Sequence, residues 1–202
     1  MRLGIVSIIL TAIILSIGTL FWYQEGQYLL PTPLPEHYTE VAPKQFIMID
    51  TGVVAKPIST PTVFHFFNPD CPCSRFNLNH FISLEKKYGH KIKFYAVVTD
   101  EIKLPAAQKM VGENIVVVAD NVGTLAKACG VYSTPQAAIL QSDQTLFYRG
   151  NYNRARYCTD KNSNYVQMAL DSLLAKRPSP HFGPLATKSY GCVLNKKEDL
   201  AL

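Results

Sequence analysis

Charged residues are scarce in this chain, and the positive ones do not gather at any point along it. Asp, Glu, Lys and Arg make up 17% of the 202 residues, and the net charge is +5. Lys and Arg are dispersed, with short pairs such as those at 86–87 and 196–197. Nucleic-acid binding requires a basic stripe or patch, so the lack of one argues against a nucleic-acid partner. The mild basicity fits a solvated surface with weak attraction to anionic lipids.

Internal repeats and low-complexity tracts are also missing from the sequence. A length of 202 residues suits one domain of ordinary size with accessory segments, because domains cluster near about 100 to 150 residues. We therefore expect a single folded core.

The first 23 residues hold no charge after Arg2, and 3–23 form one apolar run. Its length matches the roughly 20 residues needed to cross a bilayer. The run ends in Phe-Trp-Tyr at 21–23, typical of an interfacial aromatic belt, and no small-x-small cleavage site follows. These features favour an uncleaved membrane anchor over a cleaved signal peptide. Arg2 precedes the run and Glu25 follows it, which predicts a cytoplasmic N-terminus and an exported remainder.

Composition divides the rest of the chain into three parts. A proline-rich stretch at 24–44 is interpreted as a semi-extended linker between the anchor at 1–23 and the domain. The domain is predicted over 45–176. The last part, 177–202, is a proline-broken tail that carries one cysteine.

Hydrophobic periodicity predicts a mixed α/β domain. Strands are expected at 46–50, 62–67, 91–99, 114–119, 136–141 and 145–149. Helices are expected at 71–88, 122–129 and 165–175. The last two strands are joined by Ser-Asp-Gln at 142–144, which suits a hairpin. This order predicts a mixed central sheet with parallel central strands and helices on both faces.

Two thiols one residue apart, Cys71-Pro72-Cys73, follow an apolar strand and stand at the start of a predicted helix. A helix start leaves N–H groups unpaired and carries partial positive charge, which favours a thiolate and lowers its pKa below about 8.5. A second thiol provides an internal partner that can resolve a mixed disulfide. The residues alone leave redox chemistry, a metal site and a structural disulfide open.

The dithiol at a strand-to-helix junction, followed about 60 residues later by Val-Tyr-Ser-Thr-Pro-Gln at 131–136, resembles the thioredoxin superfamily. The match covers roughly 45–176 and is most similar to the membrane-anchored periplasmic branch. It implies a three-layer α/β/α fold, a location at the bacterial inner membrane with the domain in the periplasm, and a cis peptide bond before Pro135. In that family Thr134-Pro135 holds a substrate segment beside the nucleophile. The element ending at Cys192 is similar to the C-terminus of some bacterial thioredoxin-like redoxins.

The motif departs from the family pattern at two positions. Asp70 stands where the family usually has Trp, and only one residue separates the two cysteines. Cys73 is therefore rotated by about 100° around the helix from the family's resolving position. A Cys71–Cys73 disulfide would need a distorted first turn and would be more oxidising than a relaxed one, which favours an isomerase or oxidant role.

Each candidate residue has a predicted role. Cys71 is the expected nucleophile and Cys73 the expected resolving thiol. Asp70 is a candidate cap for the helix, although its charge opposes thiolate formation, and Arg75 is a candidate to offset that charge. Pro135 completes the predicted catalytic set, with Thr134 in support.

The remaining cysteines leave alternatives open. Cys129 is expected to be a small buried hydrophobe. Cys158 and Cys192 are candidates for a structural disulfide with each other. The other arrangement places Cys192, on its proline-broken segment, at the active site, where it resolves Cys71 or Cys73.

The resulting prediction is an exported, membrane-tethered thiol-disulfide oxidoreductase that exchanges disulfides with protein or peptide substrates. It needs no cofactor but requires a redox partner to restore its state. The main alternative is a copper-binding metallochaperone using Cys71 and Cys73, although its relatives use a Cys-x-x-x-Cys spacing. A thiol peroxidase is disfavoured because Asn68 stands where such sites have Thr or Ser. A degenerate docking domain is the last alternative.

Overall fold

The computed structural model describes residues 2–26, 30–49, 52–54, 58–155 and 158–194. The chain divides into two compact units, residues 1–31 and 32–202. The predicted boundaries of anchor, linker, domain and tail stay predictions.

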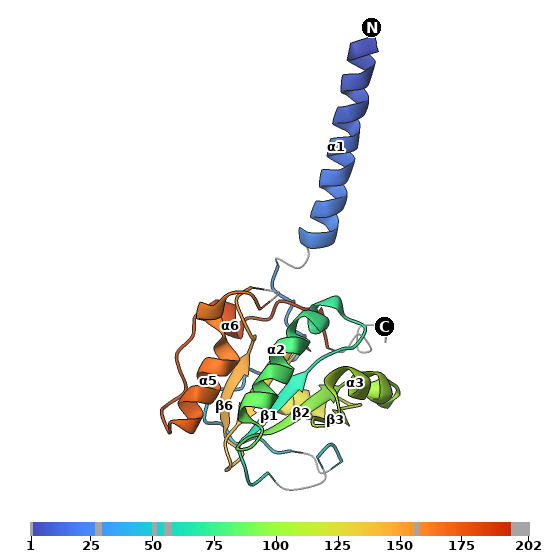
Figure 1. Ribbon diagram of the computed structural model, residues 1–202. Helices are drawn as coiled ribbons and strands as arrows, with labels where there is room; N and C mark the ends of the chain where they lie inside the picture. The colour runs from blue at the N-terminus through green and yellow to red at the C-terminus, as the bar shows by residue number, and fades with distance from the viewer. Residues whose placement is uncertain (1, 27–29, 50–51, 55–57, 156–157, 195–202) are drawn as a thin grey trace. The chain divides into compact units, whose positions relative to one another are not determined.

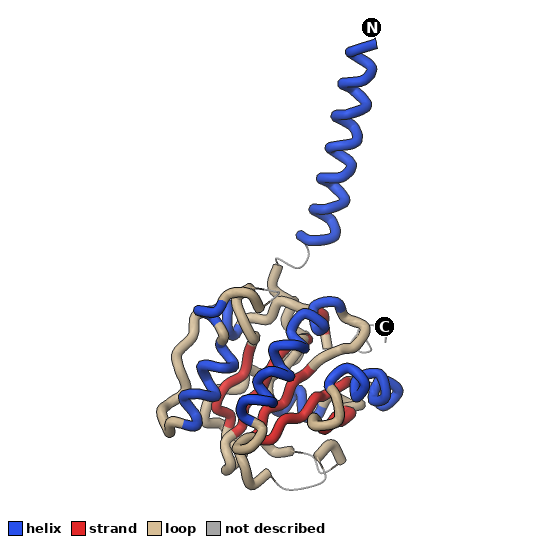
Figure 2. The backbone as a smooth tube through the Cα atoms, in the orientation of Figure 1, coloured by secondary structure: helices blue, strands red, loops and turns tan. Residues whose placement is uncertain are grey.

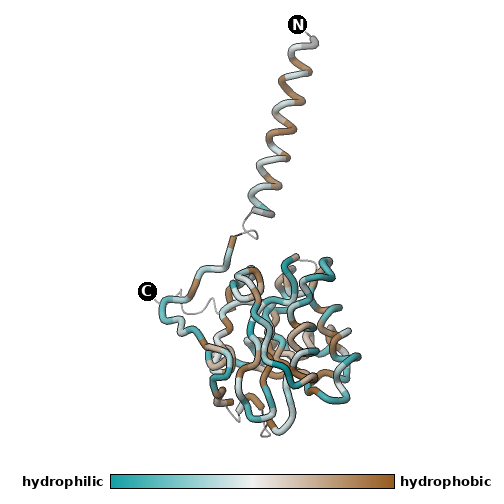
Figure 3. The backbone as a smooth tube through the Cα atoms, turned by 90° about the vertical axis from the view of Figure 1, so that its left-hand side faces the viewer, coloured by the Kyte–Doolittle hydropathy of each residue, from teal (hydrophilic) through white to brown (hydrophobic). Residues whose placement is uncertain are grey.

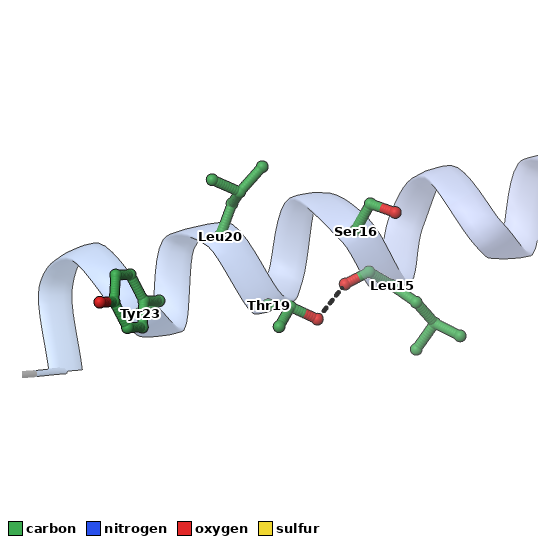
Figure 4. A pocket seen from close by; sticks show the side chains of 5 residues that line it. All are labelled: Leu15, Ser16, Thr19, Leu20 and Tyr23. Carbon is green, nitrogen blue, oxygen red and sulfur yellow. Dashed lines mark hydrogen bonds between the residues drawn. The ribbon is translucent and has the colours of Figure 1, made fainter.

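The first unit is a single long helix, α1 (Arg2–Gly26). Its 21-residue stretch Gly4–Gln24 is long and apolar enough to cross a membrane. Apolar residues recur along its whole length (Figure 3). In the shallow hollow drawn in Figure 4, the Thr19 hydroxyl donates to the Leu15 carbonyl at 2.6 Å. On the same helix, the Ser16 hydroxyl donates to the Ala12 carbonyl at 2.8 Å. Such internal bonds satisfy hydroxyls that would find no water partner in lipid. The helix therefore fits a single-pass membrane anchor.

The second unit alternates strands and helices (Figure 1). Its strands are β1 (Thr62–Phe66), β2 (Lys93–Val98), β3 (Val116–Ala119), β4 (Ser133–Thr134), β5 (Gln136–Leu140), β6 (Leu146–Gly150) and β7 (Cys192–Val193). Its α-helices are α2 (Pro72–Tyr88), α3 (Leu104–Val111), α4 (Thr124–Ala128), α5 (Tyr165–Leu174) and α6 (Pro184–Thr187). Two single 3₁₀ turns, η1 (Glu101–Lys103) and η2 (Lys161–Ser163), precede α3 and α5.

Five strands form one mixed sheet in the order β3-β2-β1-β5-β6 (Figure 2). β1 pairs in parallel with β2, and β2 with β3, whereas β5 and β6 are antiparallel to their neighbours. β4 and β7 form a separate two-stranded sheet. The central strand β1 is buried along its whole length, as expected for a strand covered on both faces.

Alternate residues of the strands enter two different cores. On one face Val63 packs with α2, α3 and α5, which lie in front of the sheet in Figure 1. On the other face Phe64 packs with α4 and with buried residues of the preceding loop, such as Val41 and Ile47. The period-2 alternation of β1 thus directs successive side chains to opposite layers.

The mixed α/β architecture predicted from the sequence is confirmed, with its mixed central sheet and its N-terminal apolar helix. The predicted hairpin is also present as the antiparallel pair β5–β6. The helix α3 was not predicted.

The strand predicted at 46–50 is wrong over its described part, and Asp50 lies outside the described residues. The segment makes only an isolated bridge between Phe46 and Thr145. Ile47 is buried, whereas Phe46 and Met48 are 58% and 79% exposed. The segment therefore lies at the edge of the hairpin with one side chain in the core and does not extend the sheet.

Candidate thiol-disulfide site

The site is built where β1 ends and α2 begins. Cys71 is the N-cap of α2, with extended backbone angles of φ −88° and ψ 121°, and Pro72 begins the helix. Proline suits this position because its missing N–H would have no helical partner there. The Cys71 side chain makes no capping hydrogen bond, and the Ser74 N–H donates to the Cys71 carbonyl at 3.1 Å, so the partial positive charge of the helix start lies next to Cys71.

Cys71 is joined by a disulfide to Cys192, which lies 121 residues further along the chain. Cys73, in the first turn of α2, is a free buried thiol. The three Sγ atoms all lie within 4.8 Å of one another. Cys71 and Cys73 are 3% and 2% exposed, whereas Cys192 is half-buried, so in this form the two cysteines of α2 are shielded from solvent and the disulfide is approached from the Cys192 side.

The loop before the helix is held by Asn68. Its side-chain oxygen accepts hydrogen bonds from the Asp70 N–H at 3.1 Å and from the Lys103 ammonium at 2.9 Å. Its own N–H donates to the Ser74 hydroxyl at 3.1 Å. Asp70 does not cap α2, contrary to one expectation. Its exposed carboxylate pairs instead with Lys103 at 3.1 Å, and the Arg75 guanidinium donates to the backbone carbonyl of Pro69 at 3.0 Å.

Pro135 and Thr134 lie beside the disulfide. The Thr134–Pro135 peptide bond is cis, as the resemblance implies. Thr134 is paired across the β4–β7 ladder with Cys192, and Ser133 with Val193. The Thr134 hydroxyl is buried and has no hydrogen-bond partner among the described residues.

The tail around Cys192 is held by hydrogen bonds that are made mostly between its main chain and neighbouring side chains. The Ser189 N–H donates to the Tyr132 hydroxyl at 3.1 Å, and the Ser189 and Ser133 hydroxyls are hydrogen-bonded to each other. On the other side of the tail, the Thr32 hydroxyl donates to the Gly191 carbonyl and accepts from the Gly191 N–H, both at 2.9 Å. The Thr32 N–H also donates to the Ser189 carbonyl at 2.8 Å.

Gly191 cannot carry a side chain in this position. A Cβ atom placed on it would lie 2.2 Å from the backbone oxygen of Thr134. The glycine before Cys192 therefore allows the two backbones to approach closely enough for the disulfide.

Cys158 and Cys129 lie apart from the disulfide. The Cys158 thiol donates to the Asn77 side-chain oxygen at 2.7 Å, and the Asn77 amide donates to the Cys73 carbonyl at 3.2 Å. Cys192 thus pairs with Cys71 and not with Cys158. Burial raises the pKa of the Cys158 thiol to about 12. Cys129 is fully buried against α4, where burial and then the charge of Asp120 raise the pKa of its thiol.

A buried histidine lies inside the strand that leads to the site. His65 of β1 stacks on Phe81 with ring centroids 4.3 Å apart, and its Nδ1 is hydrogen-bonded to the Tyr152 hydroxyl at 2.7 Å. Burial lowers the pKa of His65 to about 3. The ring is therefore neutral and belongs to the core.

Several residues that shape the site were not predicted from the sequence. They include Lys103 and Ser74, which hold the loop, and Thr32 and Ser189, which hold the tail. The Gly-Cys step at 191–192 was the local signal available, because glycine permits a close backbone approach. Lys103 and Thr32 lie far from both cysteine motifs in sequence and carry no local signal.

A family model described as Domain of unknown function (DUF6436) matches residues 46–195, most of the chain. The chain belongs to this family. Among curated proteins, none matches it in sequence.

Solved structures share its fold. A hypothetical protein from Sinorhizobium meliloti 1021 is 20% identical, with a TM-score of 0.61 over 77% of this chain and 95% of that chain. An uncharacterized conserved protein from Geobacillus kaustophilus is also 20% identical, with a TM-score of 0.60 over 82% and 98%. A thioredoxin domain of a thiol-disulfide oxidoreductase from Bacteroides vulgatus is 14% identical, with a TM-score of 0.48 over 59% and 96%. At these identities the likeness concerns the fold alone.

Proposed function

We propose that this protein is a membrane-anchored thiol-disulfide exchange protein that acts on protein or peptide disulfides outside the cytoplasm. The observation that carries the proposal is the grouping of three sulfur atoms, those of Cys71, Cys73 and Cys192, within 4.8 Å at the start of a 17-residue helix. Sulfur atoms so placed can exchange disulfide bonds among themselves and with a bound substrate.

The proposed reaction begins with the reduced site. The Cys71 thiolate, next to the partial positive charge at the start of α2, attacks one sulfur of a substrate disulfide. A mixed disulfide forms, and the other substrate sulfur leaves as a thiolate that takes up a proton. Cys73 or Cys192 then attacks Cys71, which releases the second substrate sulfur and leaves one disulfide in the protein. A redox partner restores the dithiol, and no cofactor is required.

The location follows from α1. The helix is of spanning length, and Arg2 on its N-terminal side favours a cytoplasmic start with the domain outside. This orientation supports a location of the domain in the bacterial periplasm, an oxidising compartment in which disulfides persist.

The test is a disulfide-exchange assay on the full chain in detergent. Reduced protein should cleave the disulfide of a fluorescent peptide pair, and Cys71→Ser should abolish the reaction. Cys73→Ser and Cys192→Ser should each slow turnover and accumulate mixed disulfides. Cys158→Ala is the matched control, because it removes one thiol outside the three-sulfur group, and it should retain the activity. Full activity in Cys71→Ser would refute the proposal.

A second candidate function is a Cu(I)-binding metallochaperone. It is favoured by one observation, that three soft sulfur ligands lie close enough for one ion, with no histidine among them in the described part of the chain. Anaerobic Cu(I) titration of the reduced full chain tests it. Stoichiometric binding that is lost in Cys71→Ser and Cys73→Ser, with no exchange activity, would favour this function over the first.

A further inference from the structure

β4 is a short strand whose partner in the structure is the chain's own tail. Ser133 and Thr134 pair with Val193 and Cys192, and the Leu194 N–H extends the ladder by donating to the Tyr132 carbonyl at 3.1 Å. β4 is separate from the five-stranded sheet. Among the described residues, the tail thus supplies the strand that pairs with β4.

The backbone pairing of β7 with β4 positions Cys192 next to Cys71. The Cys192 side chain enters the site because its backbone is in register with Thr134, and the hydrogen bonds around it are made mostly by backbone groups of the tail. Recognition of an extended segment through its backbone accepts other segments of the same shape. The side chain at each position of a segment then decides whether that segment fits the β4 edge.

One position is limited sharply. The residue before the cysteine lies against the Thr134 carbonyl, where any Cβ would come within 2.2 Å of the oxygen. An extended segment bound in the register of the tail must therefore carry glycine immediately before its reacting cysteine.

With the β4 edge as the substrate position that the resemblance implies, we propose that its substrates are extended protein segments containing a Gly-Cys step and that the tail occupies the edge as a competitor. This inference rests on the proposed thiol-disulfide exchange and specifies its substrate class. A substrate thiol enters by attacking Cys71, which breaks the Cys71–Cys192 bond. The bond from Cys71 to the substrate forms, and Cys192 leaves as a thiolate that takes up the proton lost by the substrate thiol.

The test uses the full-length Cys73→Ser/Cys192→Ser variant in detergent, in which Cys71 is the sole thiol of the site. Three heptapeptides carry a thiopyridyl group on their cysteine. One has the sequence of residues 187–193, Thr-Lys-Ser-Tyr-Gly-Cys-Val, and the others have alanine or valine in place of the glycine. Attack by Cys71 forms the mixed disulfide and releases pyridine-2-thione, whose absorbance gives the rate. Rates are divided by those of the same peptides with glutathione.

We expect the glycine peptide to react at least tenfold faster than the valine peptide, with the alanine peptide between them. Adding Gly191→Val to the variant should displace the tail and raise the rate of the glycine peptide several-fold. Equal rates for the three peptides, or no rise with Gly191→Val, would overturn this inference.

A small disulfide separates the two levels of the proposal. Reaction of the same variant with dithiodipyridine reports Cys71 reactivity without peptide recognition. A rapid reaction with dithiodipyridine but no preference among peptides would leave the exchange function intact and refute the substrate class. No reaction with dithiodipyridine would refute both.

Discussion

The backbone of Cys192 lies opposite that of Thr134 in an antiparallel ladder, so the sulfur that closes the site is placed by its main chain. The tail is therefore part of the site. Behind the closed bond, Cys73 is a third sulfur within 4.8 Å. Opening of the Cys71–Cys192 bond by Cys73 would need no external electrons, because the number of disulfides stays the same.

The Cys71–Cys192 bond should stabilise the folded domain. It closes a loop of 121 residues, and a crosslink of this kind restricts the unfolded chain. Dithiothreitol should lower the free energy of unfolding by about 2–4 kcal/mol. Urea unfolding of the full chain followed by circular dichroism measures this change. The Cys192→Ser variant should have the lower free energy of unfolding even without dithiothreitol, and dithiothreitol should not change it further.

Stability should fall in acid because of His65. Burial lowers the folded-state pKa of His65 to about 3, whereas the unfolded side chain titrates near 6.5. Between these values the unfolded state binds a proton that the folded state does not, so stability decreases as pH falls from about 6.5 towards 3. The loss is up to about 1.4 kcal/mol per pH unit.

Urea unfolding at several pH values checks the His65 contribution. His65→Gln should be less stable at neutral pH because it loses the stack on Phe81, but its stability should depend less steeply on pH. His90→Gln, at an exposed position, is the matched control and should keep the wild-type slope. An unchanged slope in His65→Gln would contradict the assignment.

The reduced protein should show a clear order of cysteine reactivity. Burial raises the pKa of Cys158 to about 12, so at pH 8 only about one in 10⁴ of these thiols is ionised. Cys129 is fully buried. Iodoacetamide at pH 8, with the products mapped by mass spectrometry, should modify Cys71 first and leave Cys129 and Cys158 intact. Early modification of Cys158 would contradict the raised pKa of its thiol.

The charge pair Asp70–Lys103 should tune the reactivity of Cys71. A negative charge beside a thiol disfavours the thiolate, and the Lys103 ammonium, 3.1 Å from the carboxylate, offsets that charge. Asp70→Asn should raise the alkylation rate of reduced Cys71 a few-fold at low salt, and Lys103→Met should lower it. The difference should shrink in high salt, because exposed charges are screened. Changes in the opposite direction would exclude this electrostatic role.

Thr32 should strengthen the Cys71–Cys192 bond. Its hydroxyl makes two hydrogen bonds to Gly191, worth about 1–2 kcal/mol together. In a Cys73→Ser background, Thr32→Val should lower the effective concentration of the Cys71 and Cys192 thiols for each other about five- to thirtyfold. Equilibration of the protein with glutathione measures this effective concentration. Thr39→Val, at an exposed position in the same segment, is the control.

Local sequence signals predicted much of the fold because the elements that carry the core have clear boundaries. α2 begins at Pro72 and ends before Gly89, and β1 is an apolar run that is buried throughout. The prediction of a strand at 46–50 is wrong because the same alternation of buried and exposed side chains occurs in a sheet strand and in an edge segment with one buried side chain. Here that side chain is Ile47. The helix α3 was missed, although Pro105 lies in its first turn.

The arrangement of the site depended on contacts that no local pattern encodes. β4 and β7 are two residues each and exist only because they pair across about 60 residues of chain. The cysteine motif identified where the chemistry should lie. With five cysteines, however, the spacing left the partner of Cys192 open, and the choice of Cys71 over Cys158 follows from the register of the tail on Thr134. Lys103 approaches Asp70 from the turn before α3.

The two hydrogen bonds between the Thr32 hydroxyl and the Gly191 backbone affect how soluble fragments should be prepared. A fragment starting at residue 46, where the family match begins, would retain every cysteine yet lack the side chain that bridges both polar groups of Gly191. It would also lack Val41, which is buried in the core. A redox potential measured for the Cys71–Cys192 disulfide of such a fragment would differ from that of the full chain, because the tail would be held less firmly. Fragments that begin just before Thr32 would keep both hydrogen bonds between Thr32 and Gly191.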